Sequence, residues 1–136
     1  MQETQHSRIP DDRRYTTEHI WIRRDGDAFV CGITDFAQEQ LDEVVYVGLP
    51  APGSAFAAGE SFGTVESMKS TNELFMPVTG VVIEVNATLE ESPELVNSEP
   101  YADGWLIRVK PEHPDAFETS DRLLTPAGYA AFLRQS

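Results

Sequence analysis

The centre of the chain reads Phe62-Gly-Thr-Val-Glu-Ser-Met-Lys-Ser-Thr-Asn-Glu-Leu-Phe-Met76. Two short runs, at 62–67 and 71–76, contain β-branched and aromatic residues and flank small polar residues, which predicts a β-hairpin. Lys69 lies in the turn of this hairpin, between Met68 and Ser70. Turn residues project into solvent, so other proteins can reach this lysine.

Further strands are expected on both sides of this hairpin. Residues 20–22 and 28–33 flank Asp25-Gly26-Asp27, a sequence typical of a hairpin turn. Residues 44–47, 81–85 and 104–109 also have the composition of strands. Short strands separated by glycine and proline predict a mainly β fold, a barrel or a sandwich with small peripheral helices.

The expected helices are short. Thr34 suits the N-cap of a helix over residues 35–41, and residues 93–97 form at most one helical turn. Thr125-Pro126 begins a C-terminal helix that ends near Arg134, with proline at its first position. We therefore expect one domain over residues 15–136, preceded by a flexible polar segment over residues 1–14.

The composition excludes several classes of partner. The chain of 136 residues has 23 acidic and 10 basic residues and a net charge of −13, which disfavours nucleic acid and anionic membranes. Neither a signal peptide nor a membrane span is evident, so a cytoplasmic protein is predicted. The only cysteine is Cys31, and with His6, His19 and His113 it forms no metal-ligand pattern.

The acidic residues are concentrated around one base. Between Arg24 and Arg108 the chain has 15 acidic residues, and Lys69 is the only basic one. Carboxylates near a lysine favour its protonated form, which disfavours a Schiff-base or general-base role. The pattern is compatible with a lysine that another enzyme modifies.

No catalytic constellation is evident. Ser67 and Ser70 have no histidine nearby in sequence, and no glycine-rich phosphate loop is present. Cys31 lies in an apolar strand and is interpreted as a small buried hydrophobic residue. We therefore expect no catalytic residues, and favour a binding or carrier module over an enzyme.

Six segments carry a resemblance to a known family. They are Gly32-Ile-Thr-Asp-Phe-Ala-Gln38, Val44-Val-Tyr-Val-Gly-Leu-Pro50, Gly63-Thr-Val-Glu-Ser-Met-Lys69, Gly80-Val-Val-Ile-Glu-Val-Asn86, Glu94-Leu-Val-Asn97 and Pro100-Tyr-Ala-Asp-Gly-Trp-Leu-Ile107. In this order they resemble the H-protein family of the glycine cleavage system, whose members are lipoyl carriers. The similarity runs from Tyr15 to about Arg134.

The resemblance implies a barrel-sandwich hybrid, the fold of lipoyl and biotinyl carriers, with a C-terminal helix. It also implies lipoic acid in amide linkage on Lys69, within a recognition site formed by Glu66, Ser67, Met68, Ser70 and Glu73. Such a swinging arm is a non-catalytic carrier, and tethering raises the local concentration of its reactive end. The implied partners are glycine decarboxylase, aminomethyltransferase, dihydrolipoyl dehydrogenase and a lipoate-attaching enzyme; the implied cargo is an aminomethyl group.

The chain departs from the family pattern beside the expected cleft for the arm. Family members read His-Glu-Trp where this chain has His19-Ile20-Trp21, and often histidine or tyrosine where it has Phe36. Glu73 replaces the usual aspartate. His19, Ile20 and Phe36 are therefore the candidates for the lining of the cleft, and Ile20 removes a carboxylate that could pair with a bound amine.

Two other carrier roles remain open from these residues. Lipoate-binding proteins of a heterodisulfide-reductase-like sulfur oxidation system share the H-protein fold and carry sulfur intermediates, which need no carboxylate partner; their partner would be the sulfur-oxidising reductase complex. A biotin carrier is suggested only by Met68-Lys69, because Ser70 interrupts the usual Met-Lys-Met. Glycine cleavage is the preferred hypothesis.

Overall fold

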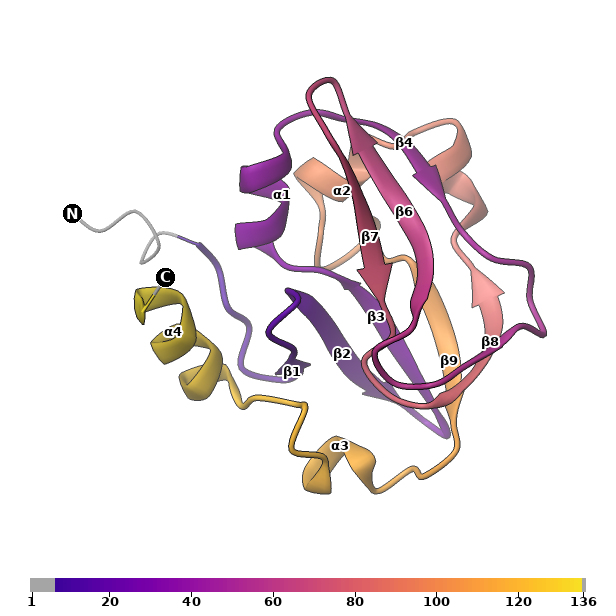
Figure 1. Ribbon diagram of the computed structural model, residues 1–136, viewed down its shortest axis with the longest axis vertical. Helices are drawn as coiled ribbons and strands as arrows, with labels where there is room; N and C mark the ends of the chain where they lie inside the picture. The colour runs from indigo at the N-terminus through magenta and orange to yellow at the C-terminus, as the bar shows by residue number, and fades with distance from the viewer. Residues whose placement is uncertain (1–6, 136) are drawn as a thin grey trace.

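The computed structural model describes residues 7–135, which form two antiparallel sheets with short helices around them (Figure 1). The six-stranded sheet has the order β1-β2-β3-β9-β8-β5 and the three-stranded sheet has the order β4-β6-β7. Within the described residues the two sheets stay separate and form no closed barrel. The prediction of a mainly β fold with peripheral helices is confirmed.

The elements have the following bounds. The strands are β1 (Arg14–Tyr15), β2 (Ile20–Asp25), β3 (Ala28–Ile33), β4 (Val44–Gly48), β5 (Ala55–Phe56), β6 (Ser61–Ser67), β7 (Thr71–Phe75), β8 (Gly80–Val85) and β9 (Ile107–Pro111). The helices are α1 (Asp35–Leu41), the 3-10 helix η2 (Ala87–Glu90), α2 (Leu95–Ser98), α3 (Ala116–Thr119) and α4 (Pro126–Gln135).

The turn and helix-cap residues predicted from the sequence have these roles in the structure. Gly26 has a φ of 64° in the β2–β3 turn, and Thr34 caps α1 by accepting a hydrogen bond from the backbone N–H of Ala37 at 3.2 Å. Thr125 accepts one from the N–H of Gly128 at 3.0 Å and so caps α4. These interactions place α1 directly after β3 and α4 at the end of the chain.

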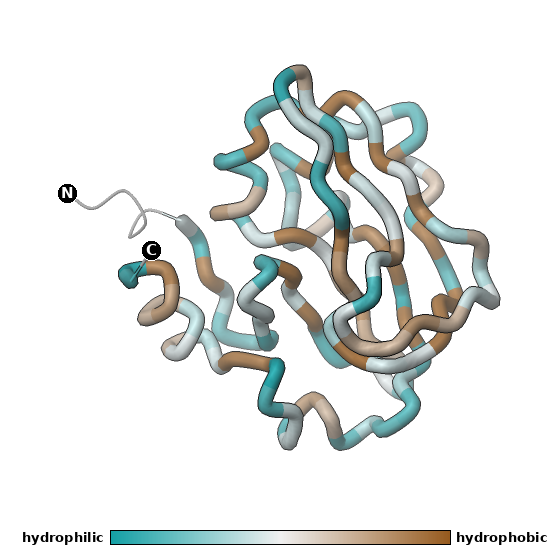
Figure 2. Tube along the Cα trace, in the orientation of Figure 1, coloured by the Kyte–Doolittle hydropathy of each residue, from teal (hydrophilic) through white to brown (hydrophobic). Residues whose placement is uncertain are grey.

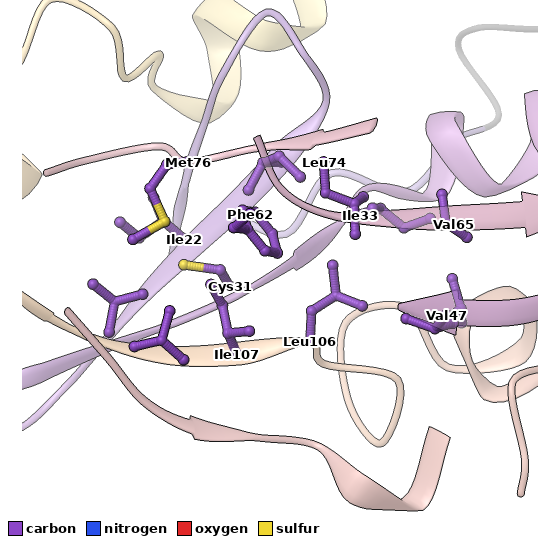
Figure 3. Packing of buried hydrophobic residues seen from close by; sticks show 14 of the residues in the cluster. Ile22, Cys31, Ile33, Val47, Phe62, Val65, Leu74, Met76, Leu106 and Ile107 are labelled. Carbon is purple, nitrogen blue, oxygen red and sulfur yellow. The ribbon is translucent and has the colours of Figure 1, made fainter. Parts of the chain in front are cut away.

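The main core fills the space between the two sheets (Figure 3). Phe62, Val65 and Leu74 from β6 and β7 face Cys31 of β3 and Ile107 of β9. Figure 2 shows hydrophobic residues interspersed along the strands, as one-sided burial requires. Cys31 has no exposed surface, and burial raises the pKa of its thiol, so its interpretation as a small buried hydrophobic residue is confirmed.

A second hydrophobic cluster attaches α4 to the outer face of the six-stranded sheet. Tyr15 stacks on Tyr129 with ring centroids 4.8 Å apart, and both are fully buried. The Arg13 guanidinium lies 4.7 Å from the Trp21 ring and is also buried. These contacts bring residues 7–14 against the domain; the flexibility expected of residues 1–14 stays a prediction, and residues 1–6 lie outside the described residues.

One strand begins later than predicted. Strand β9 begins at Ile107, whereas the sequence favoured a strand from residue 104. The backbone N–H of Trp105 donates to the carbonyl of Ala102 at 3.1 Å and closes a turn, and the Trp105 ring joins the second cluster. Strand pairing of β9 can therefore begin only after this turn.

Candidate functional site

The β6–β7 hairpin projects at one end of the molecule (Figure 1), and Lys69 lies in the turn between its two strands. The Ser67 hydroxyl is buried and accepts hydrogen bonds from the backbone N–H groups of Lys69 at 3.3 Å and Ser70 at 3.2 Å. The Ser67 N–H donates to the Ser70 carbonyl at 2.9 Å. Ser67 therefore organises the turn, while Met68 is 80% exposed and the Lys69 side chain 72% exposed.

Lys69 has one ionic partner among the described residues. Its Nζ lies 2.6 Å from Oδ2 of Asp42, and this hydrogen-bonded carboxylate raises the pKa of Lys69 above its ordinary value. The expectation that acidic neighbours favour the protonated lysine is confirmed in direction. Asp42 ends α1, and its backbone carbonyl accepts a hydrogen bond from Nδ2 of Asn97 at 2.7 Å.

The two glutamates of the motif lie along the hairpin below its tip. Glu66 pairs with Thr71 in the β6–β7 register and is half-buried, whereas Glu73 pairs with Thr64 and is exposed. Neither carboxylate makes a hydrogen bond or an ion pair within residues 7–135. Both are therefore available to a partner, unlike Asp42.

Beside this hairpin lies a pocket of about 180 Å³, enclosed by the start of β2, helix α1 and strands β6 and β7. It contains all three residues suggested for the arm cleft together with Glu73. Its lining is Glu18, His19, Ile20, Ile33, Phe36, Ala37, Gln40, Leu41, Val65, Asn72, Glu73 and Leu74. Glu73 lies on β7, four residues after Lys69 in the sequence.

His19 is the most constrained side chain of this pocket. Its backbone has a φ of 70°, and its Nδ1 lies 2.7 Å from the hydroxyl of Tyr129 in α4. The Phe36 ring packs on the imidazole with centroids 4.9 Å apart. Burial lowers the pKa of His19 from its ordinary value, so the ring is neutral near neutral pH.

Ile20 belongs both to the pocket and to the main core. Only 1% of its surface is exposed, and its backbone N–H donates to the Thr16 hydroxyl at 3.2 Å. A carboxylate at this position would lose most of its hydration. Ile20 thus gives the pocket an apolar wall where a charged residue was expected from the family pattern.

Sequence reasoning missed three residues of this site. Asp42 was one of many acidic residues, and no local pattern indicated that it pairs with Lys69. Thr34 was identified only as a helix cap, and Tyr129 only as part of a helix, although both join His19 in one hydrogen-bonded group. Their neighbours lie far away in sequence, so only the fold could identify them.

The described part of the chain offers little for other chemistries. Within residues 7–135 no group of three histidine, cysteine or acidic side chains could hold a metal ion. None of the helices there has the length and the apolar composition needed to cross a membrane. Lys110, the second lysine, lies inside β9, opposite Val81 of β8, and not in a turn.

Comparisons with known proteins agree on one family. The model of the family described as Glycine cleavage H-protein matches residues 13–136. The glycine cleavage system H protein of Anaeromyxobacter sp. (strain K) is 52% identical over 127 residues, which cover 93% of this chain and 97% of that protein. That of Bacteroides fragilis is 50% identical over 123 residues, covering 90% and 95%. The crystal structure of a glycine cleavage system H protein from Mycobacterium marinum superposes with a TM-score of 0.81 at 38% identity, covering 91% of this chain and 98% of that one.

Proposed function

The chain belongs to the glycine cleavage H-protein family, and from this premise we propose that it carries lipoic acid in amide linkage on Lys69. The exposed position of Lys69 at the tip of the β6–β7 hairpin is the observation that supports this assignment. The carrier is a non-catalytic subunit of the glycine cleavage system.

The residues around Lys69 fit such an attachment. The side chain is largely exposed, and within residues 7–135 its ion pair is with Asp42, which is itself 60% exposed. Exposed ion pairs contribute little to stability, so an attaching enzyme can separate this pair easily. Amide formation removes the charge of Lys69 and leaves the Asp42 carboxylate free.

The pocket beside the β6–β7 hairpin would then receive the end of a lipoyl arm on Lys69. Ile33, Leu41 and Leu74 exclude water there, while Glu18 and Glu73 provide carboxylates at the pocket wall. When bound, lipoate supplies a dithiol–disulfide pair that accepts and releases the one-carbon amine unit. We propose that the partners are glycine decarboxylase, aminomethyltransferase, dihydrolipoyl dehydrogenase and the lipoate-attaching enzyme.

Mass spectrometry tests the attachment site. The chain is produced in a host that makes and attaches lipoate, and intact mass and peptides are analysed for the wild type, Lys69→Arg and Lys110→Arg. We expect lipoate on the wild type and on Lys110→Arg, and none on Lys69→Arg. Lipoate on Lys69→Arg, or biotin on Lys69, would refute the proposal.

The apolar wall at Ile20 favours a second candidate, the carrier of a sulfur oxidation system. A sulfur adduct needs no carboxylate partner, whereas a protonated amine does. The test offers the lipoylated chain to a glycine decarboxylase with labelled glycine and bicarbonate, beside an established H protein. Exchange at a comparable rate supports glycine cleavage; negligible exchange that Ile20→Glu partly restores supports the sulfur role.

A further inference from the structure

One imidazole and two hydroxyl groups, those of His19, Tyr129 and Thr34, form a hydrogen-bonded chain between the pocket and the C-terminal helix α4. His19 Nδ1 lies 2.7 Å from the Tyr129 hydroxyl, which lies 2.8 Å from the Thr34 hydroxyl. Thr34 also accepts from the backbone N–H of Ala37 at 3.2 Å. Thr34 and Tyr129 have no exposed surface, so water does not compete for these hydrogen bonds.

The partners of Thr34 fix the direction of this chain of hydrogen bonds. The Ala37 N–H is a donor, so the Tyr129 oxygen is the acceptor that the Thr34 hydroxyl has within the described residues, and because Thr34 is buried, leaving its hydrogen without an acceptor would be costly. The Tyr129 hydrogen is then left for Nδ1 of His19. Nδ1 is therefore the acceptor, and the neutral ring carries its hydrogen on Nε2.

Nε2 is the atom of His19 that can meet a group in the pocket. It makes no hydrogen bond within residues 7–135, and no buried side-chain nitrogen or oxygen there lacks a partner, so Nε2 reaches solvent. His19 lines the pocket beside Ile20 and Phe36. The backbone of His19 is left-handed, with a φ of 70°, which is unusual for residues other than glycine.

We propose that His19 is a positioning residue of the pocket, whose Nε2–H donates a hydrogen bond to an acceptor atom of the group held there. The matching chemistry is a thiolate sulfur or a neutral amine nitrogen. Glu18 and Glu73 can only accept when ionised, so His19 complements them with a donor in the same pocket. This inference rests on the proposed function, because it takes the pocket to receive the arm attached to Lys69.

The tautomer of His19 is measured first, on the unmodified chain. Nitrogen-15 NMR of labelled histidine distinguishes the Nε2–H and Nδ1–H forms near neutral pH. We expect Nε2–H in the wild type and a shift toward a mixture in Tyr129→Phe, which no longer donates to Nδ1. Tyr15→Phe is the matched control, because Tyr15 stacks on Tyr129 but its hydroxyl bonds the Pro10 carbonyl. A dominant Nδ1–H form in the wild type, or no change in Tyr129→Phe, overturns the proposal.

The pocket contact is measured on the lipoylated, reduced chain by the rate at which iodoacetamide alkylates the thiols of the arm. His19→Gln keeps a donor close to the position of Nε2, whereas His19→Asn keeps one only near Nδ1. At a pH where the thiols are fully ionised, we expect alkylation about fivefold faster in His19→Asn, because a thiolate that has lost one hydrogen bond is the better nucleophile, and a near wild-type rate in His19→Gln. Equal rates in wild type and His19→Asn overturn the proposal. Absence of lipoate from Lys69 would instead refute the proposed function, and the NMR result would stand independently.

Discussion

Replacing Gly63 by alanine tests why the segment from Gly63 to Lys69 begins with glycine. Gly63 lies on β6, and a Cβ atom added there would be 2.2 Å from the carbonyl oxygen of Gly48 on β4. That oxygen belongs to the backbone, so no side-chain rotation relieves the overlap. Strands β4 and β6 would have to move apart.

The cost follows from the pairing of these strands. Gly48 pairs with Thr64 and Val47 with Val65, directly beside Gly63. Weakening about two backbone hydrogen bonds costs about 1 kcal/mol each, and the overlap itself adds about 1–3 kcal/mol. We expect Gly63→Ala to lower the free energy of unfolding by about 3–5 kcal/mol, a large part of the stability of an ordinary domain.

Urea denaturation followed by tryptophan fluorescence measures this difference. Gly26→Ala is the control, because no atom lies within 4 Å of the Cβ added there, although Gly26, unlike Gly63, has a positive φ. Only the left-handed backbone opposes that change, and it costs about 1–2 kcal/mol. If Gly63→Ala is no less stable than Gly26→Ala, the inference that β4 and β6 lie too close for a Cβ atom at position 63 is wrong.

Three further predictions concern charge. In Asp42→Asn the pKa of Lys69 should return toward its ordinary value of 10.5, because the raising carboxylate is gone; NMR titration of the lysine checks this, and an unchanged pKa would exclude Asp42 as the cause. Glu66→Gln and Glu73→Gln should reduce lipoylation or partner turnover, yet change the free energy of unfolding by less than about 0.5 kcal/mol, since neither carboxylate has a partner within residues 7–135. A large loss of stability in Glu66→Gln would identify Glu66 as structural. Because burial lowers the pKa of His19, the unfolded chain binds more protons than the folded chain below pH 6.5, the ordinary pKa of histidine. The free energy of unfolding should therefore fall as the pH decreases below 6.5. Urea midpoints measured below pH 6.5 should show a smaller fall in His19→Asn than in the wild type.

The sequence predicted those parts of the fold that depend on neighbours in the chain. The Gly26 turn and the Thr34 and Thr125 caps need only a few adjacent residues, so their patterns were sufficient. Strands β1 and β5 have two residues each, too few for any periodicity to show. They exist because β2 and β8 offer free edges, a property of the folded sheet.

The candidate site likewise has a part that local sequence predicts and a part that depends on residues far apart in the chain. Lys69 was predicted at a turn because the hairpin around it is local, and the structure adds that Ser67 holds this turn together. The contact between Thr34 and Tyr129 spans 95 residues, and its geometry depends on α4 packing against β1. No pattern within either segment predicts that contact, and the proposed tautomer of His19 follows from it.

Ile20 shows why a change in a motif has to be interpreted in the folded protein. As a departure from the family pattern it indicates a missing carboxylate, but the structure gives the same side chain a place in the core with 1% exposure. Burying an isoleucine contributes about 1.5–3 kcal/mol, whereas an unpaired carboxylate at the same depth would be destabilising. Ile20 therefore stabilises the domain, but it leaves the pocket without the carboxylate that the family pattern has at this position. The polar side chains that line the pocket are Glu18, His19, Gln40, Asn72 and Glu73, and in our proposal His19 as a donor and the two glutamates as acceptors recognise a bound group.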